Sequence, residues 1–162
     1  MCIRDRCLAG SFGSLNYLLT RQLRQAMGQS VAIFGTPDFY AFAQGDPNMT
    51  GVYTVATGVT SPAQLGPAGR QFWQTFQPSQ PRNDDLQFAP YAAQAAELLL
   101  AAIARSDGTR GSVIAELRRT RVSGGILGDF SFTKNGDMSV ASLPVFRLTP
   151  RPRPVAVLRV PG

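Results

Sequence analysis

The chain has 162 residues, of which 44% are apolar and 16% are charged, a composition typical of globular proteins with enough apolar side chains for one core. The net charge of +6 comes from arginines that are scattered along the sequence, apart from Arg118, Arg119 and Arg121 and the pair Arg151 and Arg153. No aromatic residues interleave with them, so a solvated basic surface is favoured over a nucleic-acid-binding platform. The absence of histidine excludes a Ser-His-Asp triad, a Cys-His pair and any histidine-ligated metal site in this chain.

The first six residues, Met1 to Arg6, resemble the translation of an adapter used to prepare sequencing libraries. We therefore expect residues 1–6 to be an artefact and exclude them from the fold prediction, with the natural gene beginning further upstream. The two cysteines, Cys2 and Cys7, are too few for a thiolate metal site. No apolar core of a secretory signal follows the basic residues, and no apolar run in the sequence is long enough to cross a bilayer.

The N-terminal third of the chain predicts a β–α–β unit and one further strand. Residues 7–10 are typical of the end of a buried strand, and residues 31–34 are typical of a parallel strand covered on both faces. Between them, Ser14 is a candidate helix cap, and Gly28 follows the helix where a left-handed residue is favoured. The apolar residues of this helix recur at helical spacing and are expected to be buried: Leu15, Leu18, Leu19, Leu23, Ala26 and Met27. Residues 51–56 predict the further strand.

Three helices are predicted in the middle of the chain. They span residues 67–76, 90–105 and 110–120, with a proline in the first turn of the second helix and a stop at residues 106–108. Residues 77–87 are polar and contain proline, so they predict a loop. The helix residues expected to face inward are Phe72, Trp73 and Phe76, then Tyr91, Ala95, Leu98, Leu99, Ala102 and Ile103, and finally Val113, Ile114 and Leu117.

After residue 120 the apolar pattern changes from the period of a helix to that of a strand. Phe130 and Phe132 alternate with polar residues, and residues 134–137 have the Asn-Gly centre of a hairpin turn. Residues 145–148 and 155–160 predict strands, the last at a sheet edge because prolines flank it. The sequence therefore predicts an α/β fold whose parallel sheet ends in antiparallel strands, and its few parallel units indicate part of a doubly wound domain.

Three stretches of the sequence together resemble the branched-chain amino acid (Leu/Ile/Val) binding proteins of ABC transporters. The first runs from Leu8 to the turn Gly35-Thr-Pro-Asp-Phe39 and includes Leu23-Arg24 and Gly28, and the second is Gly51-Val-Tyr53. The third and most specific runs from Tyr91 through Ser106-Asp-Gly-Thr-Arg110 and Gly125-Ile-Leu-Gly128 to Asn135-Gly-Asp137. Thr133, where the family has an acid, and the tail after Leu148 depart from the family pattern.

This resemblance implies a type I periplasmic-binding-protein fold, with two Rossmann-like lobes that have parallel sheets, of which only the C-terminal part is present. It assigns residues 7–50 to lobe 2, residues 51–56 to a strand that crosses between the lobes, and residues 57–128 to the helical part of lobe 1. Residues 129–162 would return to lobe 2. Gly58, Gly124 and Gly125 flank the implied crossings, where they allow either hinge motion or ordinary turns.

The resemblance also implies a ligand site in the cleft between the lobes. An amino acid needs an acid for its ammonium group, and Asp38 occupies the turn in which the family carries that acid, although it is equally suited to cap a short helix. Phe39 and Tyr40 are candidate walls of the pocket or plain core residues, and Phe88 and Tyr91 are candidate lining residues from lobe 1 or packing residues of a helix.

The function implied by the resemblance is that of a periplasmic or otherwise extracytoplasmic solute-binding component of an ABC importer, with or without a lipid anchor. Its partners would be an amino acid or related small solute and a membrane ABC permease, and it would work as a monomer without cofactor, metal or nucleic acid. The alternative is a ligand-sensing domain of the same fold fused to a transcriptional or signalling protein. An enzyme such as an amide hydrolase is disfavoured, because Asp84 and Asp85 lie in a polar loop without a nucleophile and base beside them.

Overall fold

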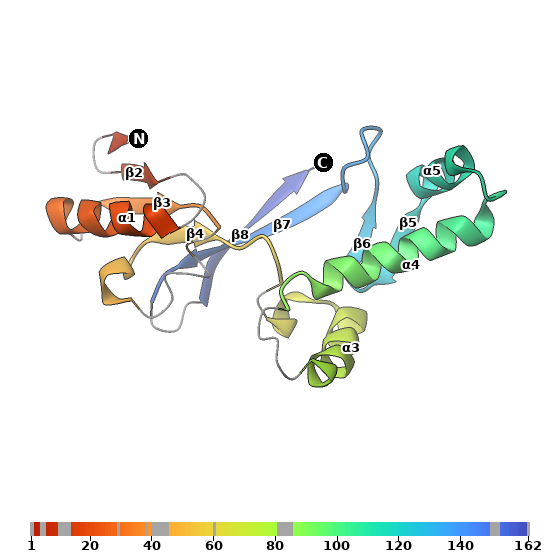
Figure 1. Cartoon of the computed structure of the whole chain (residues 1–162), viewed down its shortest axis with the longest axis horizontal. Helices are drawn as coiled ribbons and strands as arrows, with labels where there is room; N and C mark the ends of the chain where they lie inside the picture. Colours follow the sequence, from red (N-terminus) through yellow and green to blue (C-terminus); the bar gives the residue numbers. More distant parts are fainter. Residues whose placement is uncertain are drawn as a thin grey trace. The chain divides into compact units, whose positions relative to one another are not determined.

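The computed structural model describes residues 2–3, 6–9, 14–28, 30–37, 39, 46–59, 61–80, 86–149 and 153–161 (Figure 1). The chain divides into two compact units. Unit 1 comprises Met1–Thr57 and Ser142–Arg159, and unit 2 comprises Gly58–Ala141 and Val160–Gly162. Among the described residues, no helix combines the length and the apolar composition that crossing a membrane requires.

Unit 1 is built around a six-stranded sheet with the order β1-β2-β3-β4-β7-β8. Its strands are β1 (Cys2–Ile3), β2 (Arg6–Ala9), β3 (Ala32–Gly35), β4 (Tyr53–Val55), β7 (Val140–Arg147) and β8 (Arg153–Pro161). Strands β2, β3 and β4 are parallel, whereas β7 is antiparallel to β4 and β8 lies at the edge. These pairings confirm the predicted parallel sheet with antiparallel strands after it, and the edge position of the last strand.

Helix α1 (Ser14–Met27) connects β2 to β3, as the sequence predicts, and Gly28 follows it with a φ of 73°. The predicted buried face of this helix is wrong in part, because Leu18, Leu19 and Ala26 are exposed whereas Thr20 and Arg24 are buried. The helix packs through the residues Tyr17, Leu23 and Met27 against the core residues Ile33, Phe39, Met49, Val52 and Leu148. The apolar pattern failed here because leucines occupy two sides of the helix and the true packing face includes polar side chains.

Arg24 is buried at the C-terminal end of α1, where its Nη1 donates hydrogen bonds to the carbonyl oxygens of Gly28 (3.2 Å) and Val31 (2.7 Å). Both carbonyl groups lie just beyond the end of the helix, and a cation at this end also interacts favourably with the helix dipole. Desolvation, and to a lesser extent the nearby Arg147, lowers the pKa of this guanidinium. Arg24 therefore joins the end of α1 to the start of β3.

Strand β3 is covered on one face instead of two, contrary to the prediction. Ile33 and Gly35 are buried, Ile33 in the core against which α1 packs, while Ala32 and Phe34 are exposed, with Phe34 38% accessible. Alternation of this kind is the pattern of a strand with one packed face. The short apolar run could not reveal this, because the same run of apolar residues occurs in strands with one covered face and in strands with two.

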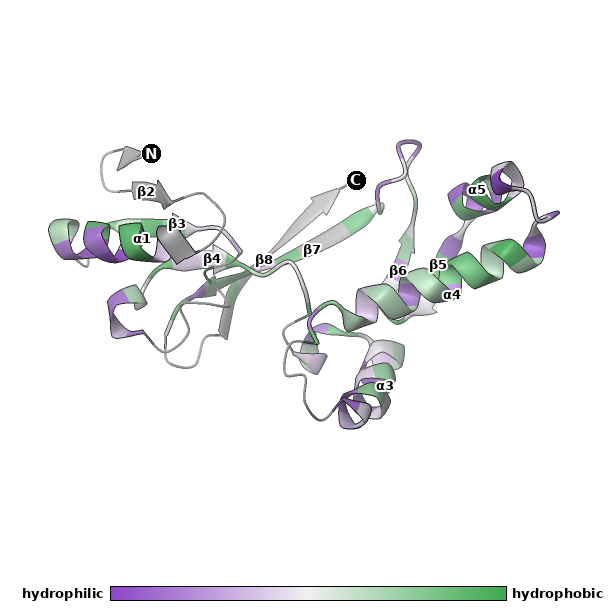
Figure 2. Ribbon diagram, viewed as in Figure 1, coloured by the Kyte–Doolittle hydropathy of each residue, from purple (hydrophilic) through white to green (hydrophobic). Residues whose placement is uncertain are grey.

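Unit 2 contains α3 (Pro67–Phe76), α4 (Ala89–Arg105) and α5 (Arg110–Arg119), followed by the two-stranded sheet of β5 (Arg121–Gly125) and β6 (Gly128–Ser131). The three predicted helices are confirmed. The predicted inward face of α4 and α5 is wrong for four residues that are exposed, whereas Gln94 is buried: Ala95, Leu99, Ile103 and Ile114. Figure 2 shows that apolar residues concentrate toward the C-terminal end of α4.

The hairpin turn predicted after Phe132 is confirmed. The Thr133 N–H donates to the Asp137 carbonyl (2.8 Å), and the Gly136 N–H donates to the Thr133 carbonyl (3.0 Å). Gly136 has a φ of 91°, a conformation that side chains disfavour, so glycine suits the last position of this turn. The segment Asn135-Gly-Asp137 is thus part of a hairpin.

Candidate functional site

The carboxyl edge of the parallel strands in unit 1 is the expected location of a site, because open α/β sheets bind ligands there. Strand β3 ends at Gly35 and β4 at Val55. The Thr36 carbonyl accepts two hydrogen bonds, from the Thr54 hydroxyl (2.6 Å) and from the Phe39 N–H (3.1 Å). Because Thr54 is fully buried, these bonds fix the turn that follows β3.

The side chain of Phe39 is buried against the start of this turn. It is 3% exposed, and a Cβ atom at Gly35 would lie 2.6 Å from the ring Cδ2 of Phe39. The close approach explains why glycine ends β3, since any larger residue would displace the ring. The structure thus places Phe39 in the core of unit 1, while Asp38 and Tyr40 lie outside the described residues.

The chain leaves and re-enters unit 1 at this same edge of the sheet. Unit 1 ends at Thr57, directly after β4, and resumes at Ser142, within β7. The Ala56 N–H donates to the Pro144 carbonyl (3.1 Å), so the outgoing and returning segments are hydrogen-bonded to each other. The edge that carries the turn after β3 is therefore also the edge at which the chain leaves unit 1 after Thr57 and returns to it at Ser142.

In unit 2, the other two predicted site residues lie at the N-terminal end of α4. Phe88 immediately precedes the helix and is 53% exposed, and Tyr91, in the first turn, is half-buried. Burial raises the pKa of the Tyr91 hydroxyl. The preceding residue Gln87 accepts a hydrogen bond at its carbonyl from the Val59 N–H (2.8 Å). Phe88 is thus next to the segment through which the chain enters unit 2, and the binding roles of Phe88 and Tyr91 stay predictions.

Buried Gln94 is a structural residue that the sequence pattern did not reveal. Its Oε1 accepts a hydrogen bond from the Leu127 N–H (3.3 Å), and its Nε2 donates to Glu97 Oε2 (3.1 Å). A Cβ atom at Gly125 would collide with this amide. One turn beyond Tyr91, Gln94 therefore joins α4 to the turn between β5 and β6.

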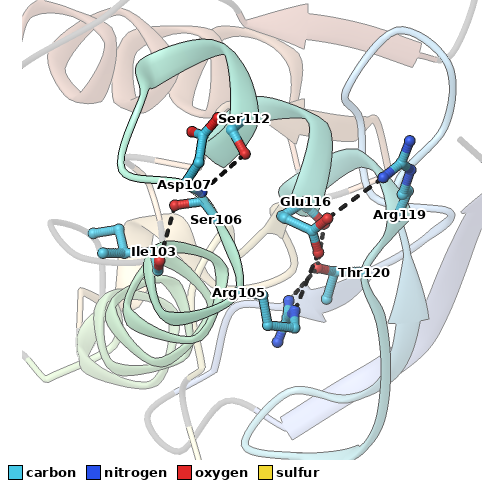
Figure 3. Close-up of polar contacts among 8 residues, drawn as sticks. All are labelled: Ile103, Arg105, Ser106, Asp107, Ser112, Glu116, Arg119 and Thr120. Carbon is cyan, nitrogen blue, oxygen red and sulfur yellow. Dashed lines mark hydrogen bonds and ion pairs between the residues drawn. The ribbon is translucent and has the colours of Figure 1, made fainter.

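A second polar cluster lies where α4 and α5 end and β5 begins. A pocket of about 230 Å³, which we call the α4–α5 groove, is lined by Arg105, Glu116, Arg119, Thr120 and Arg121. Figure 3 shows the side chains of Arg105 and Arg119 directed toward Glu116 from two sides. The sequence indicated no role for these arginines beyond that of a solvated basic surface. Across the described residues there is no group of three or more potential metal ligands.

Comparison with known proteins finds the same fold in solved structures of solute-binding proteins. The leucine-binding protein LivK from Thermotoga maritima has a TM-score of 0.63 at 22% identity, and the match covers 87% of this chain and 41% of that one. A solute-binding protein of an ABC transporter from R. palustris, solved with benzoate, has a TM-score of 0.66 at 18% identity, covering 98% and 44%. A substrate-binding protein from Desulfitobacterium hafniense, solved with leucine, has a TM-score of 0.65 at 16% identity, covering 86% and 40%.

No protein-family model matches the chain, and no curated protein matches its sequence. The structural matches nevertheless extend over most of the chain, and they confirm the fold that the sequence resemblance implied. The chain therefore has the type I periplasmic-binding-protein fold, and it spans about two fifths of the length of the solute-binding proteins that share this fold.

Proposed function

We propose that this chain is the C-terminal part of an extracytoplasmic solute-binding protein that delivers an amino acid or a similar small polar solute to a membrane ABC permease. The observation that supports this most directly is the placement of the candidate residues along the chain. The turn after β3 lies at the edge where the chain leaves unit 1, and Phe88 adjoins the segment that enters unit 2. Both sets thus lie next to the same connection along the chain.

In this proposal the two units belong to two lobes that close over the solute. Residues 7–50 are part of lobe 2, residues 51–56 cross between the lobes, and residues 57–128 belong to lobe 1. The sequence puts the return to lobe 2 at residue 129, whereas β6 and the hairpin after it belong to unit 2, so we propose that the return begins at Ser142. A solute that contacts both lobes only in the closed form shifts the equilibrium toward closure. The work of the protein is binding, and no covalent bond is made or broken.

The chemistry of the solute follows from the residues that would meet it. Leucine and benzoate, the ligands named for two of the solved proteins, both carry a carboxylate beside an apolar group, but only leucine carries an ammonium group. Asp38 is the acid in this chain that we expect to meet an ammonium, and Phe88 and Tyr91 are candidates for the apolar wall. An amino acid is therefore the solute class that these residues favour.

The test is a thermal-shift titration of the full-length protein, expressed from its natural gene, with leucine, other amino acids, benzoate and related acids. A ligand that binds only the native state raises the melting temperature. We expect a rise with an amino acid and little or none with an aromatic acid that has no ammonium group. No rise with any small solute would contradict the proposal.

A pair of variants tests the role of Asp38. Asp38→Asn removes the proposed partner of the ammonium group, so it should weaken amino acid binding by about tenfold or more. The matched control is Asp137→Asn, in the exposed hairpin turn, which should bind as the wild type does. Equal affinity of Asp38→Asn and the wild type would show that Asp38 has the structural role of a helix cap.

A further inference from the structure

More positive than negative side chains line the α4–α5 groove. Arg105, Arg119 and Arg121 line it together with a single acid, Glu116. Arg105 lies at the end of α4, Arg119 at the end of α5, and Arg121 is the first residue of β5. Within the part of the chain that the structure describes, Arg121 has no ion pair, so the groove has more guanidinium groups than Glu116 can neutralise.

The bonds that hold these arginines to Glu116 are long and exposed. Arg105 Nε lies 3.3 Å from Glu116 Oε2, and Arg119 Nη1 lies 3.4 Å from Oε1. Charge-assisted hydrogen bonds are typically about 2.7–2.9 Å long. The side chains of Arg105 and Arg119 are 48% and 77% exposed, and exposed ion pairs of this kind contribute little energy. A ligand with a stronger negative charge can therefore compete for both guanidinium groups (Figure 3).

The groove also has a neutral anchor. The Thr120 hydroxyl accepts a hydrogen bond from Arg105 Nη2 (3.2 Å) and donates one to the Glu116 carbonyl (2.9 Å). These bonds hold one edge of the Arg105 guanidinium and leave its other nitrogen, Nη1, available to a ligand. The volume of about 230 Å³ is below the range of about 300–1,000 Å³ that accommodates larger organic ligands. Its size and charge suit a small oxyanion.

We propose that the α4–α5 groove binds a phosphate group, either as free phosphate or as part of a lipid headgroup. The guanidinium groups of Arg105, Arg119 and Arg121 would bind its oxygens, since the planar arginine fork matches the geometry of phosphate. Glu116 acts as a competitor for two of these arginines. The site uses none of the residues assigned to the proposed solute, so it stands whether or not that proposal holds.

The test measures binding of inorganic phosphate to the full-length protein by isothermal titration calorimetry and by NMR of the arginine Nε–H signals. Arg121→Gln should weaken binding by about tenfold, because a bond to a charged group is lost. Glu116→Gln should strengthen binding, because it removes the competing charge. Arg118→Gln is the matched control. Arg118 is exposed on α5, the helix of Glu116 and Arg119, but does not line the groove.

The opposite signs of the two groove variants distinguish a binding site from a structural ion-pair network. If the arginines only join α4 to α5, Glu116→Gln will not increase the affinity for phosphate. Absence of saturable binding at millimolar phosphate, or equal weakening by Arg118→Gln and Arg121→Gln, would overturn the proposal.

Vesicles distinguish the two sources of the phosphate group. Binding to phosphatidylglycerol vesicles that free phosphate displaces, and that Arg121→Gln weakens, would support a lipid headgroup. Saturable binding of phosphate without vesicle binding would support free phosphate. Vesicle binding that neither phosphate nor Arg121→Gln reduces would overturn the proposal in favour of diffuse attraction between a basic protein and an acidic membrane.

Discussion

In unit 1 the guanidinium of Arg24 is buried and bonded to two backbone carbonyl groups, whereas in unit 2 the guanidinium groups of Arg105 and Arg119 lie at the surface around one carboxylate. The residue type is the same, but the surroundings differ. A buried polar group cannot exchange its partners for water, while an exposed one can. We therefore expect the Arg24 contacts to contribute to stability, and the contacts around Glu116 to leave the arginines available to a ligand.

The largest loss of stability is expected from Arg24→Ala. The change leaves the carbonyl groups of Gly28 and Val31 without their donor and opens a cavity beside α1, so the free energy of unfolding of the full-length protein should fall by about 3 kcal/mol. Urea denaturation measures this. The control, Arg21→Ala, removes an exposed arginine from the same helix and should stay within about 0.5 kcal/mol of the wild type.

A second variant separates lost volume from lost hydrogen bonds. Arg24→Met fills the space without donating to either carbonyl. It also removes the cost of burying a charge whose Nε has no hydrogen-bond partner among the described residues. It should therefore recover part of the stability that Arg24→Ala loses. If Arg24→Ala and Arg21→Ala cost the same, the buried contacts of Arg24 do not stabilise unit 1.

A smaller effect is expected at the half-buried contact between α1 and the loop before β4. The Tyr17 hydroxyl donates to Asp46 Oδ2, and Oδ1 accepts from the N–H and the side-chain amide of Asn48. These bonds, chiefly the one from Tyr17, hold the pKa of the Asp46 carboxyl below its ordinary value. The stabilisation is therefore present above the ordinary pKa of about 4 and is lost as the pH falls through the folded-state pKa.

Asp46→Asn tests this contact through its pH dependence. Near neutral pH the variant should be less stable than the wild type by less than about 1 kcal/mol, and the difference should disappear in acid, where the wild-type carboxyl is protonated. Urea denaturation across the acid range gives the profile. Tyr17→Phe should remove most of the same pH dependence, and a Tyr17→Phe profile identical to that of the wild type would exclude this bond as its cause.

Sequence alone predicted the elements whose signals are local. Proline in a first turn, apolar spacing and an Asn-Gly pair predicted helices at 67–76, 90–105 and 110–120 and the hairpin at Asn135-Gly136. The structure has these helices at Pro67–Phe76, Ala89–Arg105 and Arg110–Arg119. These features depend on residues within a few positions of one another.

Features that depend on distant partners were missed. The Thr54 hydroxyl reaches the carbonyl of Thr36, eighteen residues earlier in the chain, and threonine is common in strands for reasons that have nothing to do with hydrogen bonding. Arg24 stood out only as part of a family pattern, and nothing in its sequence neighbours indicates burial. The exposed face of β3 was missed because coverage of a strand depends on elements elsewhere in the fold.

The smallest effect is expected from Arg105→Gln in unit 2. The variant loses a 3.3 Å ion pair whose two side chains are 48% and 23% exposed, so the free energy of unfolding should change by less than about 0.5 kcal/mol, and less again at high salt. Urea denaturation at two salt concentrations measures both quantities. A loss as large as that of Arg24→Ala would show that the groove is a structural element whose arginines are held in place, and they would then be unavailable to a phosphate group. A negligible loss of stability combined with weaker phosphate binding would separate the two uses of arginine in this protein, because burial would then govern stability and exposure would govern recognition.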